Sequence, residues 1–255
     1  MRENREKVEI VIANHEQYDL ILTTDKEILS SCNNAVLFLY GTTWIGKKLT
    51  PQAQSICEYD ESTDSHLHDN KRFEVSFLMT RHFTENIPGY NIRQELWMNQ
   101  ELITVPKLFY NSYLYGLYDG SYSDIGLEYA QKNILPEGDK KLLFNSQFHI
   151  AIESLSVENY FSEKLIDAFI TKTVPIYYGC PNIGDFFDTR GMIIADAGKD
   201  ITDASKDIVE SCNKLNQNSY EEMLPFIEEN YKRAKQYSGS LAKRVKEEIE
   251  KRMNT

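Results

Sequence analysis

The distribution of hydrophobic and polar positions over residues 148–178 predicts a strand, a helix and a second strand. The first six residues, FHIAIE, form a short, largely apolar run with β-branched side chains, as in a buried strand. The segment SEKLIDAFITK then places apolar residues at the spacing of one helix face, and TVPIYY forms a second apolar run. Two such strands joined through one amphipathic helix predict a right-handed βαβ unit with parallel strands.

The same alternation of strand-like and helix-like patterns runs through the preceding part of the chain. Residues 8–13 and 18–22 are patterned as strands, or as a helix followed by a strand. A short helix is predicted at 26–31, a strand at 35–40, a strand at 73–79 and a helix at 92–103. The tail from residue 202 is helical in pattern and highly charged. The chain is therefore predicted to have an α/β fold.

A polar, acidic stretch at residues 48–70 predicts an irregular connection between two parts of this fold. Residues 1–70 would form a short Rossmann-like half, and 71–240 a second Rossmann-like domain. Residues 241–255 would form a terminal helix that packs back on the first half. About 100 residues are usual for a Rossmann-like half, so the N-terminal half is expected to be short or incomplete.

Composition is that of an ordinary folded enzyme, and charge limits the classes of partner. The chain has 255 residues, of which 41% are hydrophobic, and a net charge of −11, which argues against a nucleic-acid partner. Its four cysteines have no CxxC spacing, so neither a zinc site nor a disulfide framework is indicated. No apolar run approaches the roughly 18 residues of a membrane span, so no transmembrane segment is predicted.

The predicted helix start carries residues suited to binding an anion. Tyr160, Ser162, Glu163 and Lys164 lie within five positions, where free backbone N–H groups and the helix dipole favour negative charge. Lys164 would add a positive charge for a diphosphate, and Glu163 could accept hydrogen bonds from ribose hydroxyls. The alternative is an ordinary Ser cap, a first-turn Glu and a solvated surface Lys.

The wider pattern around these residues is ordered over positions 148–182. It comprises Phe148, Ala151, Ile152 and Glu153, then Tyr160, Phe161, Ser162, Glu163 and Lys164, then Thr173, Val174, Pro175, Ile176, Tyr177, Gly179 and Pro181. This pattern resembles the C-terminal hallmark of family 10 glycosyltransferases, the α-1,3/4-fucosyltransferases. The resemblance implies a GT-B fold, in which two Rossmann-like halves enclose a donor cleft. It also implies GDP-fucose as donor and a glycan as acceptor.

The resemblance assigns roles residue by residue. Tyr160, Glu163 and Lys164 match the block that binds the GDP part of the donor, and Glu153 belongs to the same motif. Arg93, which begins the helix-like run at 92–103, is the candidate diphosphate ligand. The alternative is a surface Arg paired with Glu95.

One departure from the family pattern bears on the donor. The family usually has Asn after the motif glutamate, and this chain has Ser154. Ser can still hydrogen-bond to a donor, but it lacks the paired donor and acceptor of an amide. The pattern therefore predicts a nucleotide sugar more securely than it predicts fucose.

Two further patterns concern the acceptor. The family uses a Glu of the N-terminal half to deprotonate the acceptor, and His15 and Glu16 are best placed for this by their order along the chain. An ordinary surface turn is the alternative for both. The tyrosine-rich run at 110–122 could line a sugar site or serve only in packing.

The sequence favours chemistry without a metal or cofactor. Asp64, His66, His68 and Asp69 have a spacing compatible with a metal site, but a polar loop that contains two histidines is the favoured explanation. The Asp-x-Asp signature of the other main glycosyltransferase fold does not occur. Diphosphate binding is therefore expected to depend on Lys164, Arg93 and the helix start.

The expected function is inverting transfer of fucose from GDP-fucose to a glycan hydroxyl. Two alternatives stay open: a catalytically inactive nucleotide-sugar-binding protein, and a glycosyltransferase that uses another nucleotide sugar. Animal and plant relatives are usually membrane-anchored in the Golgi, and no membrane span is predicted in this sequence. A cytoplasmic microbial or viral enzyme, or an excised catalytic part of a longer one, is therefore expected, with peripheral membrane association still compatible.

Overall fold

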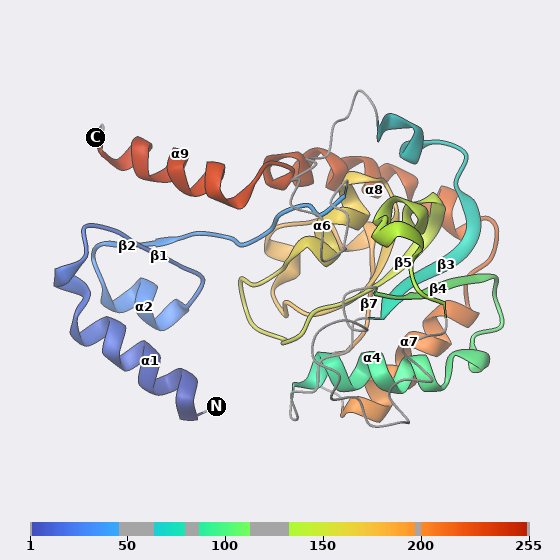
Figure 1. Ribbon diagram of the computed structural model, residues 1–255, viewed down its shortest axis with the longest axis horizontal. Helices are drawn as coiled ribbons and strands as arrows, with labels where there is room; N and C mark the ends of the chain where they lie inside the picture. Colours follow the sequence, from blue (N-terminus) through green and yellow to red (C-terminus); the bar gives the residue numbers. More distant parts are fainter. Residues whose placement is uncertain (1, 46–63, 80–86, 113–132, 197–199, 254–255) are drawn as a thin grey trace.

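The computed structural model describes residues 2–45, 64–79, 87–112, 133–196 and 200–253 (Figure 1). Its main feature is a five-stranded parallel sheet in the order β4-β3-β5-β6-β7. The strands are β3 (Arg72–Met79), β4 (Lys107–Asn111), β5 (Ser146–Ile152), β6 (Val174–Tyr178) and β7 (Ile193–Ile194). The predicted α/β class is therefore confirmed.

Helices cover both faces of this sheet. In Figure 1, α4 (Pro88–Met98) and α7 (Ile201–Asn213) lie together on one side. On the other side α6 (Glu163–Ile170) packs against α8 (Ser219–Ala234). Strands covered on both faces are expected to be apolar along their length, and all five residues of β6 are buried.

The predicted βαβ unit is present at the centre of the sheet. β5 pairs in parallel with β6, with Phe148 opposite Val174 and Ile150 opposite Ile176. The helix between them, α6, buries Leu165 and Phe169 completely. The apolar pattern of this segment therefore corresponds to a buried part of the molecule.

A smaller unit precedes the main sheet. It contains α1 (Arg2–Ala13), β1 (Ile21–Thr23), α2 (Lys26–Ser31) and β2 (Ala35–Leu37), and β1 and β2 pair in parallel. The helix at 26–31 has the predicted bounds because the Asp25 carboxylate accepts the N–H groups of Glu27 and Ile28.

The structure decides one open alternative and corrects one prediction. Residues 8–13 belong to α1 and β1 follows, so a helix followed by a strand is confirmed; the helix-forming charged residues before residue 8 extend the helix to Ala13. The helix predicted at 92–103 instead ends at Met98, where the Asn99 side chain bonds the carbonyl oxygen of Glu95, and a 3₁₀ turn (Gln100–Leu102) follows. Of the irregular connection expected at 48–70, residues 46–63 lie outside the described part of the chain.

The helical tail comprises α7, α8 and a terminal helix α9 (Leu241–Met253). Arg244 of α9 donates hydrogen bonds to the carbonyl oxygens of Leu39 and Gly41, and its guanidinium lies 5.1 Å from the ring centroid of Phe38. The end of the chain therefore contacts the segment that leaves β2.

A buried carboxylate of α6 connects that helix to the same segment. The carboxylate of Asp167 is fully buried and forms an ion pair with Lys140. It also accepts the Thr43 hydroxyl and the Trp44 N–H, each at 2.7 Å. A buried carboxylate is costly unless it is paired and hydrogen-bonded, and Asp167 meets both conditions.

A buried histidine in β5 leads to a prediction about acid stability. His149 lies 2.8 Å from the Ser76 hydroxyl, and burial, with the positive charges of Lys140 and Lys71, lowers its pKa from 6.5 to about 3. Between these pH values the unfolded chain binds a proton that the folded protein does not. The free energy of unfolding should therefore fall as pH falls through this window, by up to about 1.4 kcal/mol per pH unit.

We expect His149→Asn, which keeps a polar group near Ser76, to flatten this dependence between pH 6.5 and 4. Urea unfolding at several pH values would measure it, with the exposed His66→Asn as matched control. A slope equal to that of the unmodified protein would contradict the assignment.

Candidate functional site

The candidate site lies at the carboxyl edge of the main sheet. The loop after β5 leads into the N-terminus of α6, and the N-terminus of α4 meets the same loop through a hydrogen bond from the Gly89 N–H to the Ser154 carbonyl oxygen at 3.0 Å. Open parallel sheets bind ligands at this edge. Five of the six predicted donor-binding residues lie on that loop or at the start of α6, and Arg93 lies on α4.

Glu153, immediately after β5, connects the two ends of this loop. Its side chain is fully buried, and its two oxygens accept the Ser162 N–H and the Ser162 hydroxyl, each at 2.7 Å. Burial raises the pKa of Glu153, while Lys164 at 3.7 Å and the bonds from Ser162 oppose the rise. With both oxygens engaged, Glu153 holds the two ends of the loop together, and its place among the donor-binding residues stays a prediction.

Lys164 is held beside two carboxylates. Its ammonium nitrogen lies 2.9 Å from Glu163 Oε1 and 3.1 Å from the Ser162 hydroxyl, and 27% of its side chain is exposed. Burial alone would lower the pKa of Lys164, but the charges of Glu163 and Glu153 raise it. Lys164 is thus a firmly charged group within a network, and its interpretation as a solvated surface lysine is wrong.

Glu163 is ionised because of the positive charges beside it. Burial alone would raise the pKa of Glu163, but attraction to Lys164 and Lys140, with the hydrogen bond from Lys164, lowers it to about 2. No described side chain donates to its second oxygen, Oε2. That oxygen can therefore accept a hydrogen bond from a ligand.

Arg93 is buried rather than exposed, with 3% of its surface accessible. Its Nε and Nη2 donate to the carbonyl oxygen of Ile152 at 3.1 and 2.7 Å, and Nη2 lies 3.2 Å from the Ser154 hydroxyl. Glu95 instead bonds Asn99, so a surface pair between Arg93 and Glu95 is wrong. Arg93 connects α4 to the end of β5 and carries positive charge to the site edge.

Two tyrosines complete the surroundings of this charged cluster. The Tyr160 ring is 6.4 Å from that of Tyr40, which follows β2, and Tyr90 lies under the Arg93 guanidinium at 5.0 Å. Burial raises the pKa of Tyr160, and the charge of Glu153 adds to this. Tyr40 and Tyr90 were not predicted as site residues, because their positions depend on contacts between distant parts of the chain.

The loop also contacts the N-terminal unit at two further points. Lys26 forms an ion pair with Glu158 at 2.8 Å, and the Asn159 side chain donates to the Thr24 carbonyl oxygen at 3.2 Å. With the pair of Tyr40 and Tyr160, these contacts place the N-terminal unit beside the candidate site.

The predicted catalytic pair, His15 and Glu16, lies in a 3₁₀ turn after α1. His15 Nδ1 is 3.3 Å from the Asn34 side-chain oxygen, and the Asn34 amide donates to the His15 carbonyl oxygen at 2.8 Å. Within the described ranges, neither residue forms a hydrogen bond or ion pair with Tyr160, Glu163 or Lys164. The structure therefore does not bring them together with the donor-binding residues.

At least one residue of the possible metal site at 64–69, His68, is engaged in packing contacts. Nε2 of His68 lies 3.1 Å from the Ile170 carbonyl oxygen, and its ring packs edge-on against Tyr231. In the described part of the chain, no group of three or more His, Cys, Asp or Glu residues is placed to hold a metal. Of the tyrosine-rich run, residues 113–122 lie outside the described ranges.

Comparison with known proteins gives distant structural likenesses only. No protein-family model and no curated protein matches the chain. Three solved structures of α1,3-fucosyltransferase resemble it, one of them with GDP-fucose and one with GDP. Their identities to this chain are 19%, 18% and 18%, and their TM-scores are 0.49, 0.49 and 0.47.

The matches cover 81%, 88% and 81% of this chain but 58%, 71% and 60% of the solved chains. The chain thus spans less than two thirds of two of these structures, and similarity at this level carries no argument about activity. Separately, no helix in the described residues is long and apolar enough to cross a membrane.

Close packing at Gly89 generates a prediction about site assembly. A Cβ atom at Gly89 would lie 1.8 Å from the Glu153 carbonyl oxygen and 2.8 Å from the Ser154 Cα. Gly89→Ala must therefore push the start of α4 away from the end of β5. We expect a loss of about 1–3 kcal/mol in the free energy of unfolding.

Chemical denaturation would measure this loss. Gly239→Ala is the matched control, since nothing lies within 4 Å of a Cβ atom there. Equal unfolding midpoints for the two variants would show that α4 does not depend on this contact.

Proposed function

We propose that this chain transfers a sugar from a nucleotide diphosphate donor to an acceptor hydroxyl. The observation that carries the proposal is the charged network at the sheet edge, where Lys164 comes from the first turn of α6 and Arg93 from the second turn of α4. A departing diphosphate needs positive charge and hydrogen-bond donors placed in advance. A helix N-terminus supplies further donors for phosphate oxygens.

The motif over residues 148–182 supports a more specific proposal. The donor would be GDP-fucose, the acceptor a glycan hydroxyl, and the reaction an inverting, α-1,3-fucosyltransferase-like transfer without metal or cofactor. Lys164 would neutralise the diphosphate, and Tyr160 would donate a hydrogen bond to it or pack against a ring. Glu163 would accept from ribose hydroxyls through Oε2, because its Oε1 already accepts from Lys164.

Arg93 and Ser154 would act together at the donor. Their hydrogen bond holds the Ser154 hydroxyl at the end of β5, where the family usually has the amide of an Asn. For deprotonation of the acceptor, His15 and Glu16 remain the proposed candidates.

A second candidate function is nucleotide-sugar binding without turnover. It is favoured by the lack of any hydrogen bond or ion pair between His15 or Glu16 and the donor-binding residues within the described ranges. It predicts GDP binding with no sugar transfer. Transfer from a different nucleotide sugar is a further alternative, supported by Ser154 alone.

Calorimetric titration with GDP, UDP, ADP and CDP tests the proposed function directly. We expect GDP to bind most tightly, and binding to persist in EDTA because Lys164 and Arg93 supply the positive charge. Equal affinity for the four nucleotides would remove the guanine-nucleotide assignment. Loss of binding in EDTA with recovery in manganese would overturn the metal-independent site.

The role of Lys164 can be separated from its effect on folding. Lys164→Ala removes a charge-assisted hydrogen bond of about 1.5–3 kcal/mol, so affinity for GDP should fall roughly ten- to a hundred-fold. Guanosine, which has no phosphate, should bind equally to both proteins. Stability should also decrease, since the buried Glu153 loses its nearby positive charge.

Lys214→Ala is the matched control for Lys164→Ala, because the Lys214 side chain, immediately after α7, is 76% exposed. It should leave GDP affinity unchanged. Unchanged GDP affinity in Lys164→Ala, or an equal loss of guanosine binding, would contradict the phosphate-binding role.

A further inference from the structure

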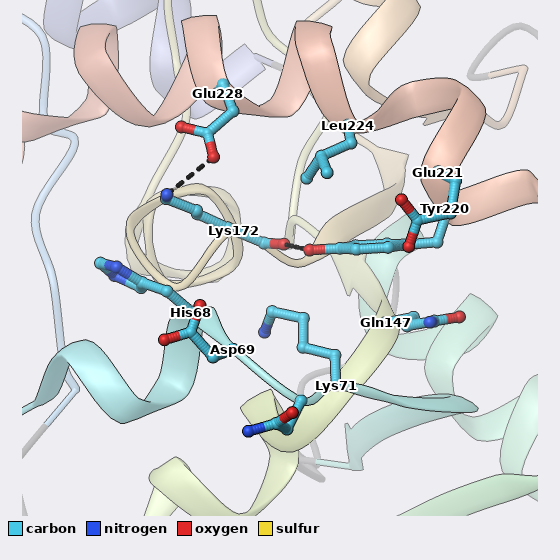
Figure 2. Close-up of a pocket in the computed structure, with 10 residues that line it drawn as sticks. His68, Asp69, Lys71, Gln147, Lys172, Tyr220, Glu221, Leu224 and Glu228 are labelled. Atoms are coloured by element: carbon cyan, nitrogen blue, oxygen red, sulfur yellow. Dashed lines mark hydrogen bonds and ion pairs between the residues drawn. The ribbon is translucent and has the colours of Figure 1, made fainter.

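A cavity of about 290 Å³ lies at the opposite edge of the main sheet, where β3 and β5 begin and α6 ends (Figure 2). Its walls come from residues 68–71, Gln147, Lys172 and the first turns of α8. With about 30 Å³ per liquid water molecule, this volume suits a small polar molecule. The cavity is separate from the candidate donor site and is not used in the proposed function.

Lys71 lines this cavity with an unusual set of partners. Its amine nitrogen donates to the Phe144 carbonyl oxygen at 2.7 Å and to the Thr173 hydroxyl at 2.8 Å. Among the described residues, no carboxylate forms an ion pair with it. An ammonium group has three N–H donors, whereas a neutral amine has two N–H donors and a lone pair. Both acceptors are uncharged, so no described carboxylate stabilises the protonated form of Lys71 through an ion pair.

A neighbouring positive charge also favours the neutral form. Lys172 follows α6 with φ at 54°, and its ammonium is held by Glu228 at 2.7 Å and by the Tyr231 ring at 5.1 Å. Figure 2 shows the side chains of Lys71 and Lys172 in the same cavity. Burial, and then the like charge of Lys172, lower the pKa of Lys71 to about 7.

The other titratable groups that face the cavity form no ion pair with Lys71. They are His68, Asp69, Tyr220, Glu221 and Glu228. The Tyr220 hydroxyl is occupied by a bond to the Lys172 carbonyl oxygen at 2.7 Å, and Glu228 by Lys172 itself. At neutral pH a larger share of Lys71 is therefore free amine than of an ordinary lysine.

We propose that Lys71 is a carbonyl-reactive lysine that forms reversible imines with small polar aldehydes entering this cavity. The nitrogen lone pair adds to the carbonyl carbon, and the carbonyl oxygen takes up protons. The nitrogen loses both of its protons, the carbon–oxygen bond breaks, and one water molecule leaves. The products are the imine and water, so no oxidant or reductant is required.

Reductive trapping compares Lys71 with surface lysines in the same molecule. The full chain is incubated at pH 7 with glycolaldehyde and cyanoborohydride, and peptide mass spectrometry gives the rate at each lysine. Lys206, Lys214 and Lys246, whose side chains are 66–76% exposed, are internal references. Lys71 should be labelled at least about tenfold faster, since its lower basicity offsets only part of the larger free fraction.

Two variants that should change the labelling rate of Lys71 in opposite directions test the effect of the Lys172 charge. Lys172→Gln removes the like charge, raises the pKa of Lys71 and should slow labelling at pH 7. Glu228→Gln leaves the positive charge of Lys172 uncompensated and should speed it, while Lys206→Gln is the neutral control. Labelling of Lys71 no faster than the surface lysines, or a change in the same direction for both variants, would overturn the proposal.

Discussion

The carboxylate of Glu153 sets the geometry of the whole candidate site. It is fully buried, and its two hydrogen bonds with Ser162 hold together both ends of the loop between β5 and α6. Ser162 is also the residue that caps α6. The place where α6 begins, and hence the place of Lys164, follows from this one interaction.

Two glycines, Gly89 and Gly179, pack directly against Glu153. A Cβ atom at Gly89 would meet the Glu153 carbonyl oxygen, and one at Gly179 would lie 2.6 Å from the Glu153 Cγ. The close approach of α4 and of the end of β6 is therefore possible only because these residues have no side chain. The positive groups of the site are already engaged by carboxylates and carbonyl oxygens, so a diphosphate would compete with internal partners rather than with water alone.

Local patterns in the sequence predicted the central βαβ unit well, because each of its elements is buried along a face with a clear period. The helix at Lys26–Ser31 was predicted from its local pattern, and its start is fixed by an equally local contact, the Asp25 cap. Arg93 was placed on the correct helix, but its burial depends on the carbonyl oxygen of Ile152, 59 positions away. The contact of Tyr40 with Tyr160 likewise joins distant segments, and no periodicity in one sequence specifies such a pair.

The hydrogen bonds from Thr43 and Trp44 to Asp167 bear on how the chain could be recombined. These two residues precede the acidic connection in the sequence, yet they satisfy a carboxylate in the middle of a helix of the main sheet. After an exchange of N-terminal halves with the junction at residue 70, Asp167 would depend on the other protein for the residue in place of Thr43 and for the backbone N–H in place of that of Trp44. Gly41 itself packs too closely on Phe161 to carry a side chain. A crossover before Gly41 would therefore keep α6 and the residues that contact it in the same parent sequence.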